Sequence, residues 1–312
     1  MLDGILFVII SLAGIVFGSN IVVVAAQKIA RTLKISELFI GLTVTAIGTS
    51  LPEIFTNIAA AVDRNAGIQT SSLALGQIIG SSITDMTLIM GIAGFIGALG
   101  LRKSALKRDG MMMVLTGILF LLFASNGVIS AVEGVIMLII FVGYILFVLQ
   151  REKAVKEVRT EKSSIVLNLL LLALGFAAII YFANILVLSA VNVAKTFNVS
   201  MTLIGVLIGL GTAAPEMSVS ITAAIRRSAE MSLGNLIGST VVNILLAIGI
   251  GATISNYVVS LQIITFDIIY MLLVFVLALI ILFEHARINK KEALVLILLY
   301  VFFLYLKIMF GI

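Results

Sequence analysis

Two segments of this chain repeat one short pattern of residues inside long apolar runs. The first reads Gly-Thr-Ser-Leu-Pro-Glu over residues 48–53, and the second reads Gly-Thr-Ala-Ala-Pro-Glu over residues 211–216. They contain the only two prolines of the chain. Proline has no N–H and its ring crowds the carbonyl four residues earlier, so Pro52 and Pro215 should each free the carbonyl of their glycine. Each pattern therefore combines a carboxylate, a hydroxyl and an unpaired carbonyl, which are all oxygen ligands.

A second pair of patterns follows further along each half. Residues 76–81 read Gly-Gln-Ile-Ile-Gly-Ser and residues 234–239 read Gly-Asn-Leu-Ile-Gly-Ser. Four residues after the serine that ends each pattern stands another polar residue, Asp85 in the first copy and Asn243 in the second. Residues four apart share one face of a helix, so each serine lies on the same face as its acid or amide.

Together these residues predict a cation site built from oxygen atoms. Hard cations such as Ca²⁺, Na⁺ and Mg²⁺ prefer oxygen ligands, whereas zinc or copper would call for His or Cys, and the chain has no cysteine and one histidine. Three acids, Glu53, Asp85 and Glu216, lie in apolar runs without Lys or Arg. Because each ionised acid at the centre of a bilayer costs roughly 2.5–3.5 kcal/mol, these three need a bound cation or a proton. The candidate ligands are Thr49, Ser50, Glu53, Ser81, Asp85, Thr212, Glu216, Ser239 and Asn243.

The apolar runs that carry these residues are typical of an all-α membrane protein. Of the 312 residues, 62% are apolar and the mean hydropathy is +1.27, which excludes a water-soluble globule of this length. The runs are too long for barrel strands and approach the roughly 20 residues of a transmembrane helix. The first of them has spanning length without a basic segment before it, so we expect a helix and no cleaved signal. The ten predicted spans are residues 4–27, 37–62, 69–99, 109–125, 128–149, 164–194, 201–225, 231–254, 262–283 and 293–310.

The distribution of basic residues gives the predicted topology. Lys and Arg collect in cytoplasmic loops, and with the N-terminus outside, all but three of the 20 basic residues fall inside, the exceptions being Arg64, Lys195 and Lys307. The net charge of +5 is explained by this bias, so a nucleic-acid partner is not needed.

The repeated patterns divide the chain into two equivalent halves. We expect a first five-helix repeat over residues 1–150, a cytoplasmic linker over 151–163 and a second repeat over 164–312. Because five is odd, the second repeat enters the bilayer from the opposite side. Such inverted repeats are typical of secondary transporters, whose substrate site lies near the bilayer midplane between the repeats.

These motifs resemble those of the calcium:cation antiporter superfamily, and within it the microbial sodium/calcium exchangers. The resemblance covers essentially the whole chain and depends on the paired Gly-Thr-x-x-Pro-Glu and Gly-x-x-x-Gly-Ser motifs. It implies ten transmembrane helices, of which the second, third, seventh and eighth form a diamond-shaped core and the first and sixth slide across it as a gate. We accordingly expect a multi-pass protein of a prokaryotic plasma membrane that functions as a monomer.

The resemblance also implies roles for individual residues. Glu53 and Glu216 would be the central Ca²⁺ ligands, assisted by backbone oxygens near Thr49 and Thr212. The other implied roles are Na⁺ sites at Ser50, Ser81 and Ser239, and positions beside the centre for Asp85 and Asn243.

The chain departs from the microbial pattern at three places. Ala213 stands where the relatives carry Ser, which removes a hydroxyl from one Na⁺ site. The best-known microbial pattern has Asn in the first repeat and Asp in the second, whereas this chain has Asp85 first and Asn243 second. The extra acid thus lies at the equivalent position of the opposite repeat. The segment from Gly205 to Gly211 is one residue shorter than that from Gly41 to Gly48. One missing helical residue rotates the preceding part of the helix by about 100° relative to its counterpart in the first half.

The expected mechanism is antiport, with no enzyme activity and no cofactor. Ca²⁺ and Na⁺ compete for Glu53 and Glu216, and the empty anionic pocket is too costly to pass through an occluded state, so exchange is obligatory. An inward Na⁺ gradient then drives Ca²⁺ out. Two alternatives stay open. The first is a proton/calcium antiporter in which H⁺ replaces Na⁺, and the missing hydroxyl at Ala213 favours it. The second is a cation channel in which the same oxygens form a selectivity filter.

Overall fold

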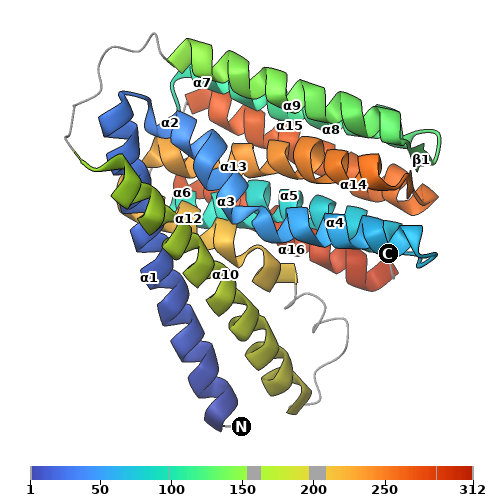
Figure 1. Ribbon diagram of the computed structural model, residues 1–312, viewed down its shortest axis with the longest axis horizontal. Helices are drawn as coiled ribbons and strands as arrows, with labels where there is room; N and C mark the ends of the chain where they lie inside the picture. Colours follow the sequence, from blue (N-terminus) through green and yellow to red (C-terminus); the bar gives the residue numbers. More distant parts are fainter. Residues whose placement is uncertain (1, 98, 153–162, 197–208, 286, 311–312) are drawn as a thin grey trace.

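The computed structural model describes residues 2–97, 99–152, 163–196, 209–285 and 287–310. Most of them lie in long helices of one bundle (Figure 1). Five short π-helical turns, labelled η, interrupt these helices. The elements of the first half are α1 (Leu2–Leu33), α2 (Glu37–Ile40), η1 (Gly41–Thr45), α3 (Ala46–Thr49), α4 (Leu51–Asn65), α5 (Ser71–Thr84), η2 (Asp85–Ile89), α6 (Met90–Ile96), α7 (Lys103–Ala105), η3 (Leu106–Gly110), α8 (Met111–Ala124), β1 (Val128–Ile129) and α9 (Ala131–Glu152). Those of the second half are α10 (Ile165–Thr196), α12 (Ala214–Ile225), α13 (Ala229–Val241), η4 (Val242–Ile248), α14 (Gly249–Ile254), β2 (Tyr257–Val258), η5 (Ile263–Asp267), α15 (Ile268–His285) and α16 (Lys290–Phe310).

The described residues form seven helices that are long and apolar enough to cross a membrane, or eight spans if the bent pair Glu37–Thr49 and Leu51–Asn65 counts as one. These eight coincide with eight of the ten predicted spans. The predicted span 109–125 coincides with α8, whose 14 residues are fewer than the roughly 20 that a bilayer core needs. Residues 201–208 of the predicted span 201–225 lie outside the described residues. The count of ten stays a prediction.

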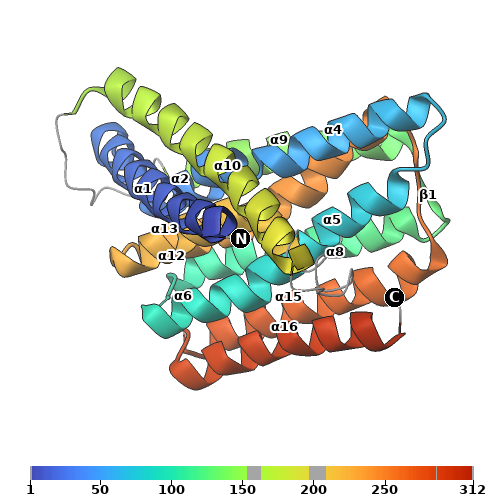
Figure 2. The same cartoon turned by 90° about the horizontal axis from the view of Figure 1, so that it is seen from below.

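Two helices of 32 residues each, α1 and α10, form a pair. They pack along each other, and in both views the pair lies obliquely against the remaining helices (Figures 1 and 2). α1 also packs against α12. Each of these long helices therefore has one face toward its partner and another toward the helices that carry the candidate ligands.

The helices with the repeated motifs form the centre of the bundle. α13 packs against the run from α2 to α3, while α12 packs against α13 and α6. Glycine permits a close backbone approach between two of them: a Cβ on Gly41 would lie 2.7 Å from the Met231 carbonyl oxygen and 3.0 Å from the Gly234 Cα. Small residues at helix interfaces are typical of membrane bundles. This contact brings the first proline motif next to the second Gly-Ser motif.

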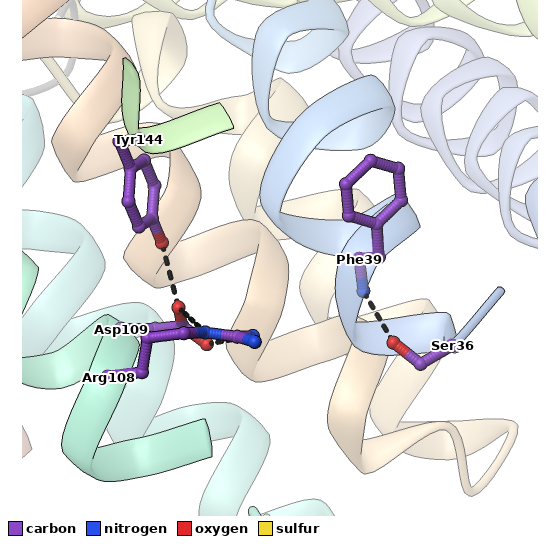
Figure 3. Close-up of polar contacts among 5 residues, drawn as sticks. All are labelled: Ser36, Phe39, Arg108, Asp109 and Tyr144. Atoms are coloured by element: carbon purple, nitrogen blue, oxygen red, sulfur yellow. Dashed lines mark hydrogen bonds and ion pairs between the residues drawn. The ribbon is translucent and has the colours of Figure 1, made fainter. Parts of the chain in front are cut away.

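The helical run from α2 to α3 begins with a defined N-cap. The Phe39 backbone N–H donates to the Ser36 hydroxyl oxygen at 3.0 Å (Figure 3). Ser is a preferred N-cap residue because its side chain satisfies one of the N–H groups that the first helical turn leaves without a partner. The helix that carries the first proline motif therefore begins at Glu37, as predicted.

One short two-stranded sheet joins the two halves, and the sequence did not predict it. β1 and β2 pair antiparallel, with Val128 opposite Val258. The predicted span 128–149 was therefore wrong at its start: residues 128–129 pair with β2, and α9 begins at Ala131, whose N–H donates to the Asn256 side-chain oxygen at 2.9 Å. An isolated bridge between Gly100 and Arg287 makes a second connection between the halves.

Candidate functional site

Both proline motifs stand where a helix is interrupted. The first helix bends by 48° between Glu37–Thr49 and Leu51–Asn65, and in the second copy α12 begins directly after a turn at Ala213. The two junction residues share one backbone conformation, with φ −83° and ψ 9° at Ser50 and φ −81° and ψ 3° at Ala213. Because proline cannot donate to the carbonyl four residues earlier, each break leaves a backbone acceptor in the protein interior, where such backbone is tolerated within a membrane.

Three buried carboxyl groups lie in the part of the core behind these breaks. Glu53 lies in the first turn of α4, Glu216 in the first turn of α12 and Asp85 at the start of η2, and all three are fully buried. They lie close enough for the charges of Glu53 and Asp85 to act on Glu216, and for that of Glu53 to act on Asp85. Buried like charges repel one another and are costly to remove from water. The cluster therefore favours a bound positive charge.

Most oxygens of these acids are unsatisfied by the described protein. Both carboxylate oxygens of Glu53, both of Asp85 and Oε2 of Glu216 have no hydrogen-bond partner among the described residues. Ion pairs between described residues join Arg102 to Glu230, Arg108 to Asp109 and Lys307 to Asp267, and none of these three pairs includes an acid of the cluster. Buried polar atoms are normally hydrogen-bonded, so unsatisfied carboxylate oxygens indicate a place for a cation or a proton.

Hydroxyl groups connect the two halves at the same place. The Ser50 hydroxyl donates to Glu216 Oε1 at 3.1 Å, and the Thr49 hydroxyl lies 3.4 Å from that of Ser239. The Ser81 side chain lies next to Glu53, and its hydroxyl oxygen has no partner among the described residues. The structure thus brings together predicted ligands from motifs that lie far apart in the sequence.

The two polar residues after the Gly-Ser motifs coincide with π-helical turns. Asp85 is the first residue of η2, and Asn243 lies in η4. Asn243 is fully buried, neither of its side-chain polar atoms has a partner among the described residues, and its turn packs against α4, which carries Glu53. π-helical turns are rare and occur frequently at functional sites. The sequence motif located both residues, but it contained no signal for the altered helix geometry.

Thr212 differs from the other eight candidates because it is only half-buried. Its hydroxyl donates to the Gly209 carbonyl oxygen of its own helix at 2.9 Å, whereas its counterpart Thr49 is fully buried and lies beside Ser239. The shortened segment from Gly205 to Gly211 precedes it, and residues 205–208 lie outside the described part of the chain. Only the backbone oxygen of Thr212 is thus a candidate ligand.

The set of donors fits a cation that is bound through mixed oxygen ligands. Among the described residues, no three His, Cys, Asp or Glu side chains converge on a single metal position. A cation held by Glu53 or Glu216 would therefore complete its shell with hydroxyl and carbonyl oxygens, which Ca²⁺ and Na⁺ accept.

Two buried amides that were not among the predicted ligands support this site. Asn235 accepts a hydrogen bond from the Thr49 hydroxyl at 3.3 Å and donates to the Ser220 hydroxyl at 3.0 Å. Asn57 donates to the Glu53 carbonyl oxygen at 3.1 Å and accepts from the Tyr257 hydroxyl at 3.1 Å. Asn235 lies inside the repeated Gly-Ser motif, so that motif could have identified it, whereas the contact between Asn57 and Tyr257 has no local signal.

Comparison with known proteins identifies related chains. The family model described as "Sodium/calcium exchanger protein" matches residues 4–150 and 167–309. The sodium/calcium exchanger MaX1 of Methanosarcina acetivorans is 28% identical over 343 residues, which cover 95% of this chain and 97% of that protein. An uncharacterized membrane protein of Methanocaldococcus jannaschii is 33% identical over 256 residues, or 80% of this chain and 81% of that one.

The fold agrees with a solved exchanger. The structure of the sodium-calcium exchanger NCX_Mj soaked with 10 mM Na⁺ and zero Ca²⁺ superposes with a TM-score of 0.82 at 27% identity, over 96% of this chain and 97% of that one. MaX1 and NCX_Mj are ion exchangers and therefore transporters. Since the family model accounts for both halves of the sequence and the fold agrees over nearly its whole length, this chain belongs to the sodium/calcium exchanger family of the calcium:cation antiporters.

Proposed function

We propose that this protein is a secondary antiporter that exchanges Ca²⁺ for Na⁺ by alternating access and normally extrudes Ca²⁺. The observation that carries the proposal is the cluster of Glu53, Asp85 and Glu216, three fully buried acids whose carboxylates find no basic partner in the described residues. An empty cluster with several negative charges is too costly to move through an occluded state within a bilayer. The site therefore changes sides only when it is occupied, and this makes exchange obligatory.

We assign the ligands as the resemblance implies. Glu53 and Glu216 bind Ca²⁺ at the centre, together with backbone oxygens near Thr49 and Thr212. This assignment is supported by the two helix breaks, which leave carbonyl acceptors one turn before each glutamate. The remaining assignments are Na⁺ at Ser50, Ser81 and Ser239, and Asp85 and Asn243 beside the central ion.

We further propose ten transmembrane helices in two inverted repeats, with the N-terminus outside and a linker over residues 151–163. The two separate matches to one family model support two repeats. So does the spacing of the π-helical turns, because the interval from Asp85 to Asn243 equals that from Asp109 to Asp267, and all four residues lie in such turns. We place the protein as a monomer in the plasma membrane of a prokaryote.

The gate in this proposal is the pair of α1 and α10. The two helices pack mainly against each other, and both make smaller contacts with α12, while α1 also contacts α2 and η1. A pair that is attached to the core through few elements can slide without breaking the central helix packing, which the glycine contact between Gly41 and Gly234 makes close.

Exchange of Ca²⁺ for H⁺ is a second candidate, and one observation favours it. Ala213 occupies the position equivalent to Ser50, so Glu53 lacks the hydroxyl that Glu216 receives from Ser50. Both oxygens of Glu53 are without a hydrogen-bond partner in the described part of the chain. A carboxyl group in this environment is a good proton acceptor, because burial disfavours its charged form.

Uptake of ⁴⁵Ca²⁺ into proteoliposomes tests the proposal. Vesicles are loaded with Na⁺, with K⁺ or with an acid interior, and the intact protein is compared with Glu53→Gln and Glu216→Gln. We expect uptake that requires internal Na⁺ and is lost in both variants. Uptake driven by the acid interior alone would establish proton coupling instead, and uptake that is indifferent to the internal cation would indicate a channel.

A further inference from the structure

A basic pocket lies at the end of the bundle where α8 begins and α9 ends. It has a volume of about 660 Å³, and its lining includes four cationic side chains and no acidic one, namely Arg102, Lys107, Arg108 and Arg151. The remaining lining residues are small or apolar, namely Ser104, Ala105, Met111 and Phe147. A concave surface with this composition selects a ligand that carries negative charge.

The cations of this pocket are held in place by neighbouring groups. Arg108 contacts the fully buried Asp109 through two hydrogen bonds, of 2.7 Å from Nε and 2.9 Å from a terminal nitrogen. Asp109 Oδ1 also accepts from the Tyr144 hydroxyl at 3.0 Å, which ties α9 to the same group (Figure 3). The Arg151 guanidinium lies 5.5 Å from the centre of the Phe147 ring, a favourable cation–π distance. The pocket is therefore preorganised for an anion.

The charge balance of the pocket is positive. Asp109 offsets the charge of Arg108, and Glu230 lies 3.3 Å from Arg102. Neither acid lines the pocket, and the exposed Lys107 and Arg151 add two further positive charges to its rim. Each cation near a membrane surface attracts anionic lipid by about 1 kcal/mol.

A separate apolar groove lies further along the same two helices. It has a volume of about 330 Å³ and lies between α8 and α9, with Leu115, Ile118 and Leu122 on α8 and Ile140 on α9. Met111 of the basic pocket lies one turn before Leu115 on the same helix face. From Met111 to Leu122 the helix rises roughly 16 Å, which is close to the roughly 15 Å hydrocarbon thickness of one leaflet.

We propose that the protein binds an anionic phospholipid here, with the headgroup phosphate in the basic pocket and one acyl chain in the groove between α8 and α9. Only this ligand class uses both features. A free phosphate would leave the groove without a ligand, and a zwitterionic lipid would gain little from the excess of positive charge. The site lies on elements that carry none of the nine candidate ion ligands, so it is separate from the exchange site.

Lipid titration of the purified, detergent-solubilised protein tests this proposal. Phosphatidylglycerol, phosphatidylcholine with the same chains, and inorganic phosphate are added separately, and bound lipid is counted by native mass spectrometry while the melting temperature is recorded. We expect phosphatidylglycerol alone to bind with one-to-one stoichiometry and to raise the melting temperature. Equal effects of both lipids would overturn the proposal, and an equal effect of phosphate would assign the pocket to a free anion.

Charge variants separate the site from general attraction of anionic lipid. Lys107→Gln combined with Arg151→Gln should weaken phosphatidylglycerol binding about 30-fold, which corresponds to roughly 1 kcal/mol for each cation. The matched control combines Lys103→Gln with Lys291→Gln, two exposed residues that line neither the pocket nor the groove. The control should bind as the intact protein does, and equal weakening in both double variants would overturn the proposal.

A groove variant tests the position of the acyl chain. Ile118→Trp fills the groove and should weaken phosphatidylglycerol binding, whereas Ile139→Trp, at a side chain of α9 that is 65% exposed and does not line the groove, should not. If Ile118→Trp leaves phosphatidylglycerol binding unchanged while the charge variant weakens it, the headgroup pocket acts without the groove, and the proposed position of the acyl chain is wrong.

Discussion

Ser50 donates a hydrogen bond to Glu216 Oε1 at 3.1 Å, so the junction residue of the first broken helix contacts the acid of the second. The equivalent residue Ala213 has the same backbone conformation but no hydroxyl to offer Glu53. Both Glu53 oxygens lack a hydrogen-bond partner within the described residues. The two halves, although built from one pattern, are therefore not equivalent at the site.

Replacement of Ser50 by Ala should raise the internal Na⁺ concentration needed for half-maximal ⁴⁵Ca²⁺ uptake about tenfold. The variant removes a hydroxyl that donates a hydrogen bond to a carboxylate, and such bonds contribute roughly 1.5–3 kcal/mol. A loss of about 1.4 kcal/mol lowers an affinity tenfold. Ser50→Thr keeps the hydroxyl and serves as the control. An unchanged Na⁺ requirement in Ser50→Ala would show that this hydroxyl does not line a Na⁺ site.

The reciprocal change, Ala213→Ser, should lower the Na⁺ requirement. It supplies the missing hydroxyl near Glu53 at a position that is fully buried and has the backbone conformation of Ser50. The same uptake assay checks it, with Ala214→Ser as the control for an added hydroxyl one residue away. If Ala213→Ser instead leaves the Na⁺ dependence unchanged and alters only the response to an acid interior, proton coupling at Glu53 is the better description.

Neutralising Asp85 should weaken Ca²⁺ binding, and restoring the acid on the opposite repeat should recover it. We expect Asp85→Asn to lower the apparent Ca²⁺ affinity at least tenfold, or about 1.4 kcal/mol, because one of three buried charges is lost. The double variant Asp85→Asn with Asn243→Asp keeps the total charge and should regain most of that loss. Equilibrium ⁴⁵Ca²⁺ binding measures the affinity of both variants. Equally weak binding in the single and double variants would show that positions 85 and 243 are not equivalent for Ca²⁺ binding.

A disulfide between α1 and α12 should stop transport if α1 has to slide. The buried hydroxyls of Ser19 and Thr222 share a hydrogen bond of 2.8 Å, and the chain contains no cysteine, so Ser19→Cys with Thr222→Cys gives one defined pair. Oxidation should reduce exchange to background, and reductant should restore it. The control pair, Val128→Cys with Val258→Cys across β1 and β2, should form a disulfide without loss of activity. Full activity of the oxidised Ser19/Thr222 pair would contradict a moving α1.

Gly238→Ala should destabilise the protein by about 1–3 kcal/mol, the usual cost of overpacking a core. A Cβ on Gly238 would lie 2.7 Å from both the Ala46 Cβ and the Leu42 carbonyl oxygen, so α13 would have to move away from the helix that carries Thr49. A lower melting temperature in detergent checks this result. Gly143→Ala, on an exposed face where no described atom lies within 4 Å of the new Cβ, should not lower it.

Much of the architecture follows from local properties of the chain. Long apolar runs identify spanning helices because each must supply about 20 apolar residues in sequence, and eight of the ten predicted spans coincide with helices of spanning length and hydropathy. The α8 segment is the informative exception. The charged residues Lys107, Arg108 and Asp109 lie just before it in η3, where they supply a buried ion pair and part of a basic pocket. The apolar helix itself therefore keeps only 14 residues, fewer than a bilayer core needs.

The sequence by itself determined the class of the protein and the types of residue at its site, because composition, the only two prolines and the duplicated motifs are properties of the linear chain. It did not determine which hydroxyl meets which acid. The bond from Ser50 to Glu216, the π-helical turns at Asp85 and Asn243, and the contact of Asn57 with Tyr257 depend on how helices from the two halves pack. That packing is set by close backbone approach at glycines such as Gly41 and by side chains far apart in sequence, so only the tertiary structure decided these contacts.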